Sequence, residues 1–336
     1  MAKVVKSLGI VVLVLLVLAA IGITATIGWR PFIGSKSRAL TDRKFALTPE
    51  RLKRGTYLAE HVSGCTDCHT LFKDGPNGQE SVTEMKGAGQ LFPIPGFPGR
   101  LVAPNITPDR ETGVGNWTDD ELARAIREGI GRDGQTLFPL MPYSHFRHMS
   151  DEDLASVVVY LRALTPIRNP LPASYVHFPV KYLIRGVPEP VTTVVQADLS
   201  TAVSRGSYLV EIAVCSECHT PIKQGRPEEA LKFAGGQVFY EPSGKITSAN
   251  ITQDATGIGG YTEETFLKAM RTGYVGKRQL NTLMPWQFYS GQTDEDLKDI
   301  YAYLKTLPAI SHHVDNSKPG TMCKKCGTVH GGGDAN

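Results

Sequence analysis

The sequence predicts a mainly α-helical protein, made of two similar repeats that follow one apolar N-terminal helix. Three observations lead to this fold class. An uncharged run extends from Leu8 to Trp29, helical periodicity recurs in later segments while strand patterns are scarce, and one set of short motifs occurs twice in the same order. With 336 residues, the chain has room for about two domains of ordinary size, at ~100–200 residues each.

Residues 1–29 are expected to form a membrane-spanning helix. Lys3 and Lys6 precede the apolar run, which as a helix would be ~33 Å long and would cross a hydrocarbon core of ~30 Å. A signal peptide is the alternative, but its apolar part is usually only ~7–15 residues long and ends at a small-x-small cleavage site. The sequence around Ala25 leaves that alternative open, and we expect an uncleaved anchor.

A basic stretch follows, and residues 30–45 are expected to be a juxtamembrane linker. Its basic side chains could lie against anionic lipid head groups or could simply be solvated. They are Arg30, Lys36, Arg38, Arg43 and Lys44. The formal net charge of the whole chain is only +3, and basic and aromatic residues do not interleave along any periodic element, so we expect no nucleic-acid partner.

Two copies of one pentapeptide predict the cofactor. Cys65–His69 and Cys215–His219 both have the pattern C-x-x-C-H, which is the attachment pattern for c-type haem. Thiols at this spacing can form thioether bonds with the two vinyl groups of one porphyrin, while the next imidazole lies under the iron. A zinc site would need further ligands, and a redox disulfide would need no histidine. We therefore expect two covalently bound haem c groups. They would be attached through Cys65, Cys68, Cys215 and Cys218, with His69 and His219 as iron ligands.

The duplication extends far beyond these motifs. The first repeat, residues 46–165, and the second repeat, residues 198–310, share six further segments. The matches are Arg54–Leu58 with Arg205–Leu209, Gly89-Gln90 with Gly236-Gln237, Asn105–Asp109 with Asn250–Asp254, Thr112–Thr118 with Thr256–Thr262, Leu140–Pro142 with Leu283–Pro285, and Asp151–Leu154 with Asp294–Leu297. Between the repeats, residues 166–197 are rich in proline, which indicates an extended connector.

Each repeat is expected to contain three main helices. Helix 49–62 begins after Thr48 with a proline at its first position. Helix 118–128 begins with a capping box made by Thr118 and Glu121. Helix 150–164 begins with Ser150 and an acidic first turn. The second repeat has the same helices at 203–213, 262–272 and 293–307. Such small helical units bury little apolar surface alone, so a haem would complete each core.

The second axial ligand of each iron is expected to be a methionine. Met141 and Met284 occupy matching positions, and each is followed by proline in a loop before the last helix of its repeat. The other methionines within the repeats, and the rival histidines, have no matching ligand. These are Met85, Met149, Met270, His61, His145 and His148. Gap-filling in the core is the alternative role for a methionine, whereas two matched residues beside two haems favour ligation.

The repeated segments, taken with the haem motifs, resemble class I cytochrome c modules. More narrowly, they resemble the cytochrome c subunits of membrane-bound bacterial alcohol and gluconate dehydrogenases. The resemblance covers about residues 46–310. It implies two tandem modules, each with a few helices around one haem, and a role in passing electrons from a quinoprotein or flavoprotein partner to a quinone or another carrier. It also implies that four residues line the haem pockets, although loop packing is an equal alternative for them. They are Asn105, Trp117, Asn250 and Tyr261.

The tail, residues 311–336, departs from that family, whose subunits typically carry three haems. Its cysteine pair, Cys323 and Cys326, is followed by Gly327, which cannot ligate iron. A local disulfide is expected in an oxidising compartment. The alternatives are a soft-metal site that includes His330, with His312 or His313, and a pair of free thiols on a flexible tail.

The expected function is single-electron transfer by a tethered dihaem cytochrome. Because haem is attached covalently on the outer side of the bacterial membrane, the repeats should be periplasmic, with one span in the cytoplasmic membrane. The expected partner is a redox protein, a dehydrogenase or a respiratory complex. A dihaem enzyme, of the peroxidase or thiosulfate dehydrogenase type, is the main alternative, but it should break the symmetry of the distal ligands. A cytochrome subunit of a terminal oxidase is a weaker one.

Overall fold

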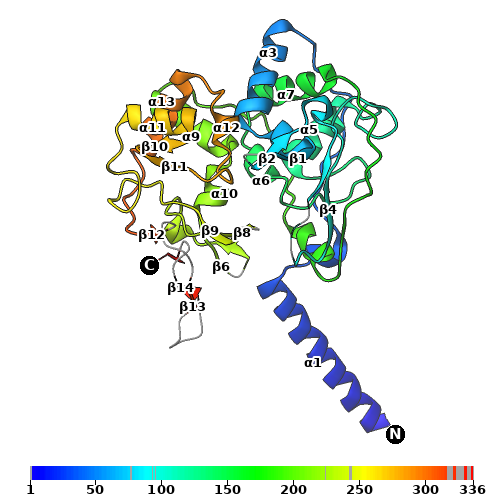
Figure 1. Cartoon of the computed structure of the whole chain (residues 1–336). Coiled ribbons are helices and arrows are strands. Elements are labelled where there is room, and N and C mark those ends of the chain that lie inside the picture. Colours follow the sequence, from blue (N-terminus) through cyan, green and yellow to red (C-terminus); the bar gives the residue numbers. More distant parts are fainter. Residues whose placement is uncertain are drawn as a thin grey trace.

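The computed structural model describes residues 2–75, 78–92, 94, 96–223, 225–241, 244–315, 321–322, 329–330 and 334–335, and it is mainly helical. The first helix, α1 (Ala2–Thr26), extends away from the rest of the protein (Figure 1). Within the described residues, its segment Val4–Thr26 is the one helix long and apolar enough to cross a membrane, with a mean hydropathy of 3.0 and none of its apolar window buried. A cleaved signal sequence would share these properties.

Six helices of two to four turns form the two repeats, as the capping patterns predict. In the first repeat they are α3 (Pro49–Tyr57), α5 (Asp119–Glu128) and α7 (Asp151–Ala163), and in the second α9 (Ala202–Ile212), α11 (Glu263–Thr272) and α13 (Asp294–Leu304). Short helices complete the set: α2 (Arg30–Ile33), α4 (Cys65–His69), α6 (Tyr143–Phe146), α8 (Val180–Leu183), α10 (Cys215–His219) and α12 (Trp286–Tyr289), with 3₁₀ turns at Thr83–Met85, η3 (Ile184–Gly186) and Glu229–Leu231.

Strands are short and antiparallel. One sheet has three strands, β3 (Gln90–Phe92), β4 (Gly99–Ala103) and β5 (Tyr175–Val176), so it joins the first repeat to the connector. The remaining pairs are β1 (Phe72–Gly75) with β2 (Gly78–Ser81), β6 (Ile222–Lys223) with β7 (Arg226–Pro227), β8 (Val238–Glu241) with β9 (Gly244–Thr247), β10 (Tyr274–Val275) with β11 (Arg278–Gln279), β12 (Val314–Asp315) with β15 (Asp334–Ala335), and β13 (Thr321–Met322) with β14 (Val329–His330). Cys323 and Cys326 lie outside the described residues.

The main helix pair of each repeat packs backbone against backbone. In the first repeat α3 crosses α7, and in the second α9 crosses α13. A Cβ added to Gly55 would lie 1.9 Å from the carbonyl oxygen of Ser156, and one added to Gly206 would lie 1.8 Å from that of Asp299. Since these distances are far shorter than any van der Waals contact, glycine alone fits both crossings. This explains why glycine stands at the matching position of both Arg-Gly-x-Tyr-Leu segments.

The two repeats contact each other through a pseudo-two-fold interface, and one continuous apolar cluster runs through both. The hydroxyl of Tyr208 donates to Asp153 at 2.7 Å and accepts from the N-cap nitrogen of α7 at 3.0 Å. In the matching contact, the hydroxyl of Tyr57 donates to Asp296 and accepts from the N-cap nitrogen of α13 at 3.1 Å. Each repeat therefore caps the last helix of the other, an arrangement in which the same surface is used on both sides.

One residue breaks this symmetry. After Tyr57 the chain continues as a π-helix, η1 (Leu58–Val62), whereas α9 has no such segment. A π-turn accommodates one extra residue in a helix, and the first repeat has one more residue than the second between the shared leucine and the shared cysteine. Within η1, the backbone oxygen of His61 accepts from Gln292 Nε2 at 3.0 Å. The extra residue therefore lies at the interface between the repeats.

The hydrogen bonds also correct one of the proposed matches. The backbone N–H of Gly89 donates to the carbonyl oxygen of His69 at 2.7 Å, and the N–H of Gly235, not Gly236, donates to that of His219 at 2.8 Å. Gly89 therefore corresponds to Gly235. The match of Gly89-Gln90 with Gly236-Gln237 is therefore one residue out of register in the second repeat.

The segment after α2, which was expected to be a juxtamembrane linker, packs against the first repeat. Arg38 forms a two-pronged ion pair with Asp120, at 2.7 and 2.8 Å, and contacts Glu128 at 2.7 Å. Although burial raises the pKa of Asp120, the hydrogen bonds from Arg38 and Thr41 and the charge of Arg38 lower it to about 2. Arg43 lies 3.4 Å from the same carboxylate. Arg38 and Arg43 thus contact α5, which corrects the expectation that these side chains could lie against lipid.

Candidate haem site

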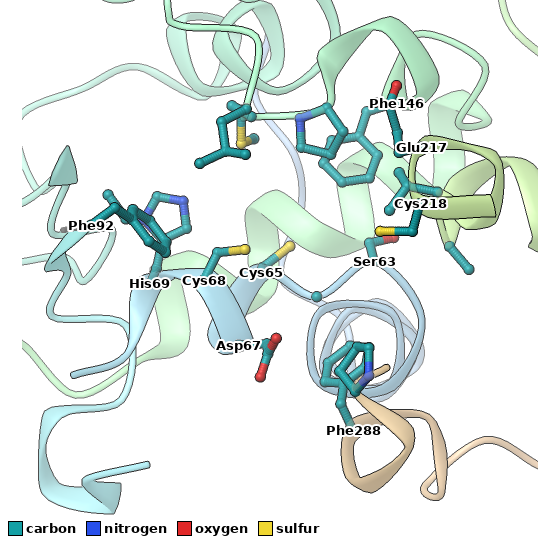
Figure 2. Close-up of a pocket in the computed structure, with 18 of the residues that line it drawn as sticks. Ser63, Cys65, Asp67, Cys68, His69, Phe92, Phe146, Glu217, Cys218 and Phe288 are labelled. Atoms are coloured by element: carbon teal, nitrogen blue, oxygen red, sulfur yellow. The ribbon is translucent and has the colours of Figure 1, made fainter. Parts of the chain in front are cut away.

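Both C-x-x-C-H motifs line one cavity of about 2210 Å³ between the repeats. Sites for small ligands and cofactors usually measure ~300–1,000 Å³, so this cavity can hold more than one large group. Figure 2 shows Cys65, Cys68 and His69 along one helix, with Cys218 of the second motif facing the same space. Each motif thus has its own helix but shares the cavity with the other.

The helices that present the cysteines begin in the same unusual way. The residue before α4 is Gly64, with φ +66°, and the residue before α10 is Val214, with φ +53°. These left-handed residues turn the chain sharply from the long helix into the short one. A β-branched residue is strained in this conformation, so Val214 shows that the turn is imposed by its surroundings.

The four motif cysteines are free thiols that line the cavity; Cys65 and Cys215 are partly buried, and Cys68 and Cys218 are exposed. Desolvation by the surrounding protein raises the pKa of Cys65, Cys68 and Cys215 to about 12, so the free thiols stay protonated at neutral pH. A zinc ligand or a redox nucleophile would instead need a stabilised thiolate. Among the described residues, no group of three or more His, Cys, Asp or Glu side chains could hold a metal ion. The described residues therefore supply no further ligands for zinc beside either motif, whereas haem attachment needs only the two thiols and the histidine.

Each motif histidine is oriented by a backbone carbonyl. Nδ1 of His69 lies 2.7 Å from the oxygen of Pro104, and Nδ1 of His219 lies 2.7 Å from that of Ala249. A carbonyl accepts only, so Nδ1 carries the proton and Nε2 keeps its lone pair. Burial lowers the pKa of both histidines, although each carbonyl partly opposes this. The result is two neutral imidazoles in the tautomer that a metal-ligating histidine requires.

Met141 and Met284 also line the cavity, in matching backbone turns. The N–H of Met141 donates to the carbonyl of Phe138, and that of Met284 to the carbonyl of Asn281, both at 3.1 Å. The proline after each methionine is the N-cap of α6 or α12. Met149 is fully buried outside the cavity, while Met270 does line it. Met141 and Met284, the pair predicted from the repeat, thus line the same cavity as the two motif histidines.

The four predicted pocket residues all border the cavity. Asn105 is buried, and its amide donates to the carbonyl of Ile167 at 2.7 Å and to Thr112 at 3.0 Å, while Asn250 donates to the carbonyl of Ile310 at 2.8 Å. These asparagines hold the segments that follow α7 and α13 against the loop, so their polar groups are already used. Trp117 and Tyr261 are partly buried beside the apolar cluster.

Sequence reasoning missed the aromatic residues of the cavity. Phe146, Phe288 and Tyr289 lie on α6 and α12 and line it, and the hydroxyl of Tyr289 donates to the carbonyl of Ala213 at 2.9 Å. The signal that could have found them is the aromatic pair after each Leu-Met-Pro segment. Burial raises the pKa of Tyr289 well above its ordinary value, so its proton stays in place.

His145 joins the repeats through two carboxylates. Its Nδ1 lies 2.9 Å from Glu211 and its Nε2 lies 2.6 Å from Glu217. Burial lowers the pKa of His145, but the hydrogen bonds and charges of the two glutamates outweigh this and raise it to about 9. The sequence offered no partner for His145, because all these contacts cross from one repeat to the other.

We expect this ion pair to make stability depend on pH. Because the folded pKa of His145 lies above its unfolded value of ~6.5, the stabilisation is complete below about pH 6.5 and is lost as pH rises through about 9. Urea unfolding at pH 6 and pH 9.5 should show a difference between the wild type and His145→Gln that shrinks at the higher pH. His148→Gln is the comparison variant; it removes only a longer contact to Glu211, at 3.9 Å from a 60% exposed side chain, so its effect should be much smaller. An equal difference at both pH values would contradict the ion pair.

No protein-family model matches the chain. A diheme cytochrome c-type protein of Cereibacter sphaeroides is 30% identical over 266 residues, which are 74% of this chain and 83% of that protein. The chain belongs to the c-type cytochrome family. The cytochrome c subunit of a quinone alcohol dehydrogenase of Gluconobacter oxydans and the cytochrome subunit of a fructose dehydrogenase of Gluconobacter japonicus are each 30% identical over 275 residues. These cover 77% of this cytochrome and 55% and 53% of the relatives, so it spans about half the length of those subunits.

A c-type cytochrome holds haem covalently, and this site fits that cofactor. The cavity is mostly apolar in its lining, the thiols are paired at the right spacing on short helices, and each histidine is neutral with a free Nε2. Three of the relatives are named as cytochrome subunits of alcohol, fructose and gluconate dehydrogenases.

Proposed function

We propose that this cytochrome is a dihaem electron carrier, built from two class I modules at residues 46–165 and 198–310 that are joined by connector 166–197. The supporting observation is that both C-x-x-C-H motifs open into one cavity, each with a carbonyl-oriented histidine and a matching methionine. One relative is itself named a diheme cytochrome. Haem c supplies one-electron chemistry when it is bound.

Each haem would be held by the cysteines, the histidine and the methionine of one repeat. Cys65 and Cys68 would hold one haem and Cys215 and Cys218 the other. His69 and His219 would ligate one side of each iron, and Met141 and Met284 the other side. A methionine thioether is a softer and weaker donor than an imidazole, so it would favour the ferrous state and hence a higher potential than two histidines would.

The shared cavity supports electron transfer between the two sites. Residues of both motifs line this one cavity, together with Ser63, Phe146 and Phe288 (Figure 2). The matched methionines also favour a carrier over a dihaem enzyme, in which one iron must offer an open position to substrate. An electron that enters at one repeat could therefore leave from the other.

The partner is proposed to be a dehydrogenase. Relatives bear the names of cytochrome subunits of alcohol, fructose and gluconate dehydrogenases, and this chain would collect electrons from such a partner and pass them to another carrier. We further propose that α1 is an uncleaved anchor in the bacterial cytoplasmic membrane, with the haem modules on the periplasmic side. Its length and hydropathy support this.

A count of haems and electrons tests the proposal. The full chain, produced with a cytochrome c maturation system, should contain two haems by pyridine haemochrome and intact mass, and should accept two electrons per chain in a reductive titration. The double variant Cys215→Ser/Cys218→Ser should contain one haem and accept one electron. A wild-type protein with a single haem, or with rapid carbon monoxide binding in its native state, would contradict the dihaem carrier.

A further inference from the structure

The chain after α1 returns to the connector and packs against it. Helix α2 contacts α8 and η3, and Arg185 donates to the carbonyl of the buried Pro31 at 3.2 Å. The indole of Trp29 donates back to Thr24 of α1 at 3.0 Å. Figure 1 shows α1 leaving the body of the protein at this place. The end of the apolar helix and the connector therefore form one structural unit.

This unit exposes an unusual number of apolar side chains. Phe178 is 82% exposed, Ile33 68% and Phe32 59%. Further exposed apolar or aromatic residues lie close to them in the chain, namely Trp29, Tyr182, Leu183 and Val187. We call residues 29–33 and 175–187 together the aromatic shelf. Scattered exposed apolar residues are ordinary, but a group of them on packed neighbouring segments marks an interaction surface.

Charge identifies the kind of partner. The aromatic shelf contains Arg30, Lys181 and Arg185 and no acidic residue. The guanidinium of Arg185 stacks over the ring of Tyr182 at 4.5 Å. Aromatic rings mixed with cations are typical of protein segments at the boundary between lipid head groups and acyl chains, where anionic lipids attract the basic groups. Aromatic residues and arginine are also enriched at protein interfaces, and the direct continuity of this surface with the end of α1 favours lipid as the partner.

We propose that the aromatic shelf is a lipid-contacting surface that seats the first repeat on an anionic membrane. The inference rests on the proposed anchoring by α1, because the shelf continues directly from the end of that helix. It goes beyond anchoring, since the connector lies more than a hundred residues further along the chain. Lys181 and Arg185 also line the cavity, so the shelf would hold this side of the shared cavity next to the bilayer surface.

Photolabelling in vesicles tests the proposal with the full haem-loaded chain. The vesicles contain phosphatidylcholine and phosphatidylglycerol, with a trace of phospholipid that carries a diazirine near the glycerol, and adducts are mapped by mass spectrometry. We expect adducts in α1 and also in residues 175–187. Phe178→Glu should reduce the adducts in 175–187 several-fold and leave those in α1 unchanged. Tyr240→Glu is the matched control, because Tyr240 is 78% exposed on β8 of the second repeat, and it should change neither.

The outcomes separate the shelf from the anchor. Labelled α1 with unlabelled 175–187 would overturn the shelf and leave the anchor intact. Labelling of 175–187 that is equal in the wild type and Phe178→Glu would also overturn it. Labelling of 175–187 with none in α1 would support the shelf and overturn the anchor, whereas no labelling of either segment would overturn both. Weaker labelling of 175–187 in vesicles of phosphatidylcholine alone is expected from the basic residues.

Discussion

Gly206→Ala should destabilise the cytochrome by about 3 kcal/mol or more, because α9 and α13 would have to move apart. The new methyl group would lie 1.8 Å from the carbonyl oxygen of Asp299 and 2.9 Å from Cβ of Tyr303. Neither the carbonyl nor a Cβ can swing away as the end of a long side chain can. Overpacking of a core usually costs ~1–3 kcal/mol, and a clash with backbone belongs at the upper end. Urea unfolding of the haem-loaded protein, followed by far-ultraviolet circular dichroism, measures the loss.

Two further variants give this prediction its control. Gly55→Ala makes the same change at the matching crossing of α3 and α7 and should have a similar cost. Gly260→Ala adds a methyl group where no atom lies within 4 Å, so its stability should stay within about 0.5 kcal/mol of the wild type. If Gly206→Ala unfolded at the same urea concentration as Gly260→Ala, the close crossing of α9 and α13 would be wrong.

Met141→Ala and Met284→Ala should each remove about half of the near-infrared band that arises from sulfur-to-iron charge transfer in the ferric protein. Each methionine is proposed to ligate one iron, so each variant should also lower the potential of one haem and let it bind carbon monoxide quickly. The band, the redox titration and the binding rate report on the iron itself. A role in packing alone would leave all three nearly unchanged.

Met270→Leu is the matched control for the ligand variants. Met270 lines the cavity beside the second repeat, but the first repeat has Ile126 at the corresponding place in α5, so the structure offers no matching pair there. Met270→Leu should keep the full near-infrared band, and carbon monoxide should still bind slowly, as in the wild type. An unchanged band in both Met141→Ala and Met284→Ala would exclude these residues as ligands.

Local signals predicted much of the helical structure. Thr48, Thr118 and Ser150 are the N-caps of α3, α5 and α7, as expected, because capping depends on residues only a few positions apart. The motif cysteines and histidines lie on the cavity for the same reason, since each set is carried by a single turn of helix. Met141 and Met284 were identified because they occupy matching positions in the two repeats.

The remaining features depend on contacts that no local pattern reports. The bond between Tyr57 and Asp296 joins residues that are far apart in the chain, and so does the pairing of Arg38 with Asp120. The π-helix has no cap or motif of its own in the sequence, where it is marked by the extra residue before the first cysteine pair. Gly89 was matched one residue out of place for a related reason, since shared letters do not reveal which N–H donates to His69. The features that the sequence did not reveal depend on tertiary contacts, whereas the helix caps that it did reveal depend on residues a few positions apart.

The reciprocal capping by Tyr57 and Tyr208 affects how the sequence of such a chain can evolve. In a homodimer with a two-fold axis, any substitution at the interface appears on both sides at once, so a change that helps one side can harm the other. In this chain the two sides are encoded separately. The extra residue in η1 and the His145 ion pair are present on one side only. A fused pair can thus keep a symmetric framework and still give its two C-x-x-C-H motifs different surroundings.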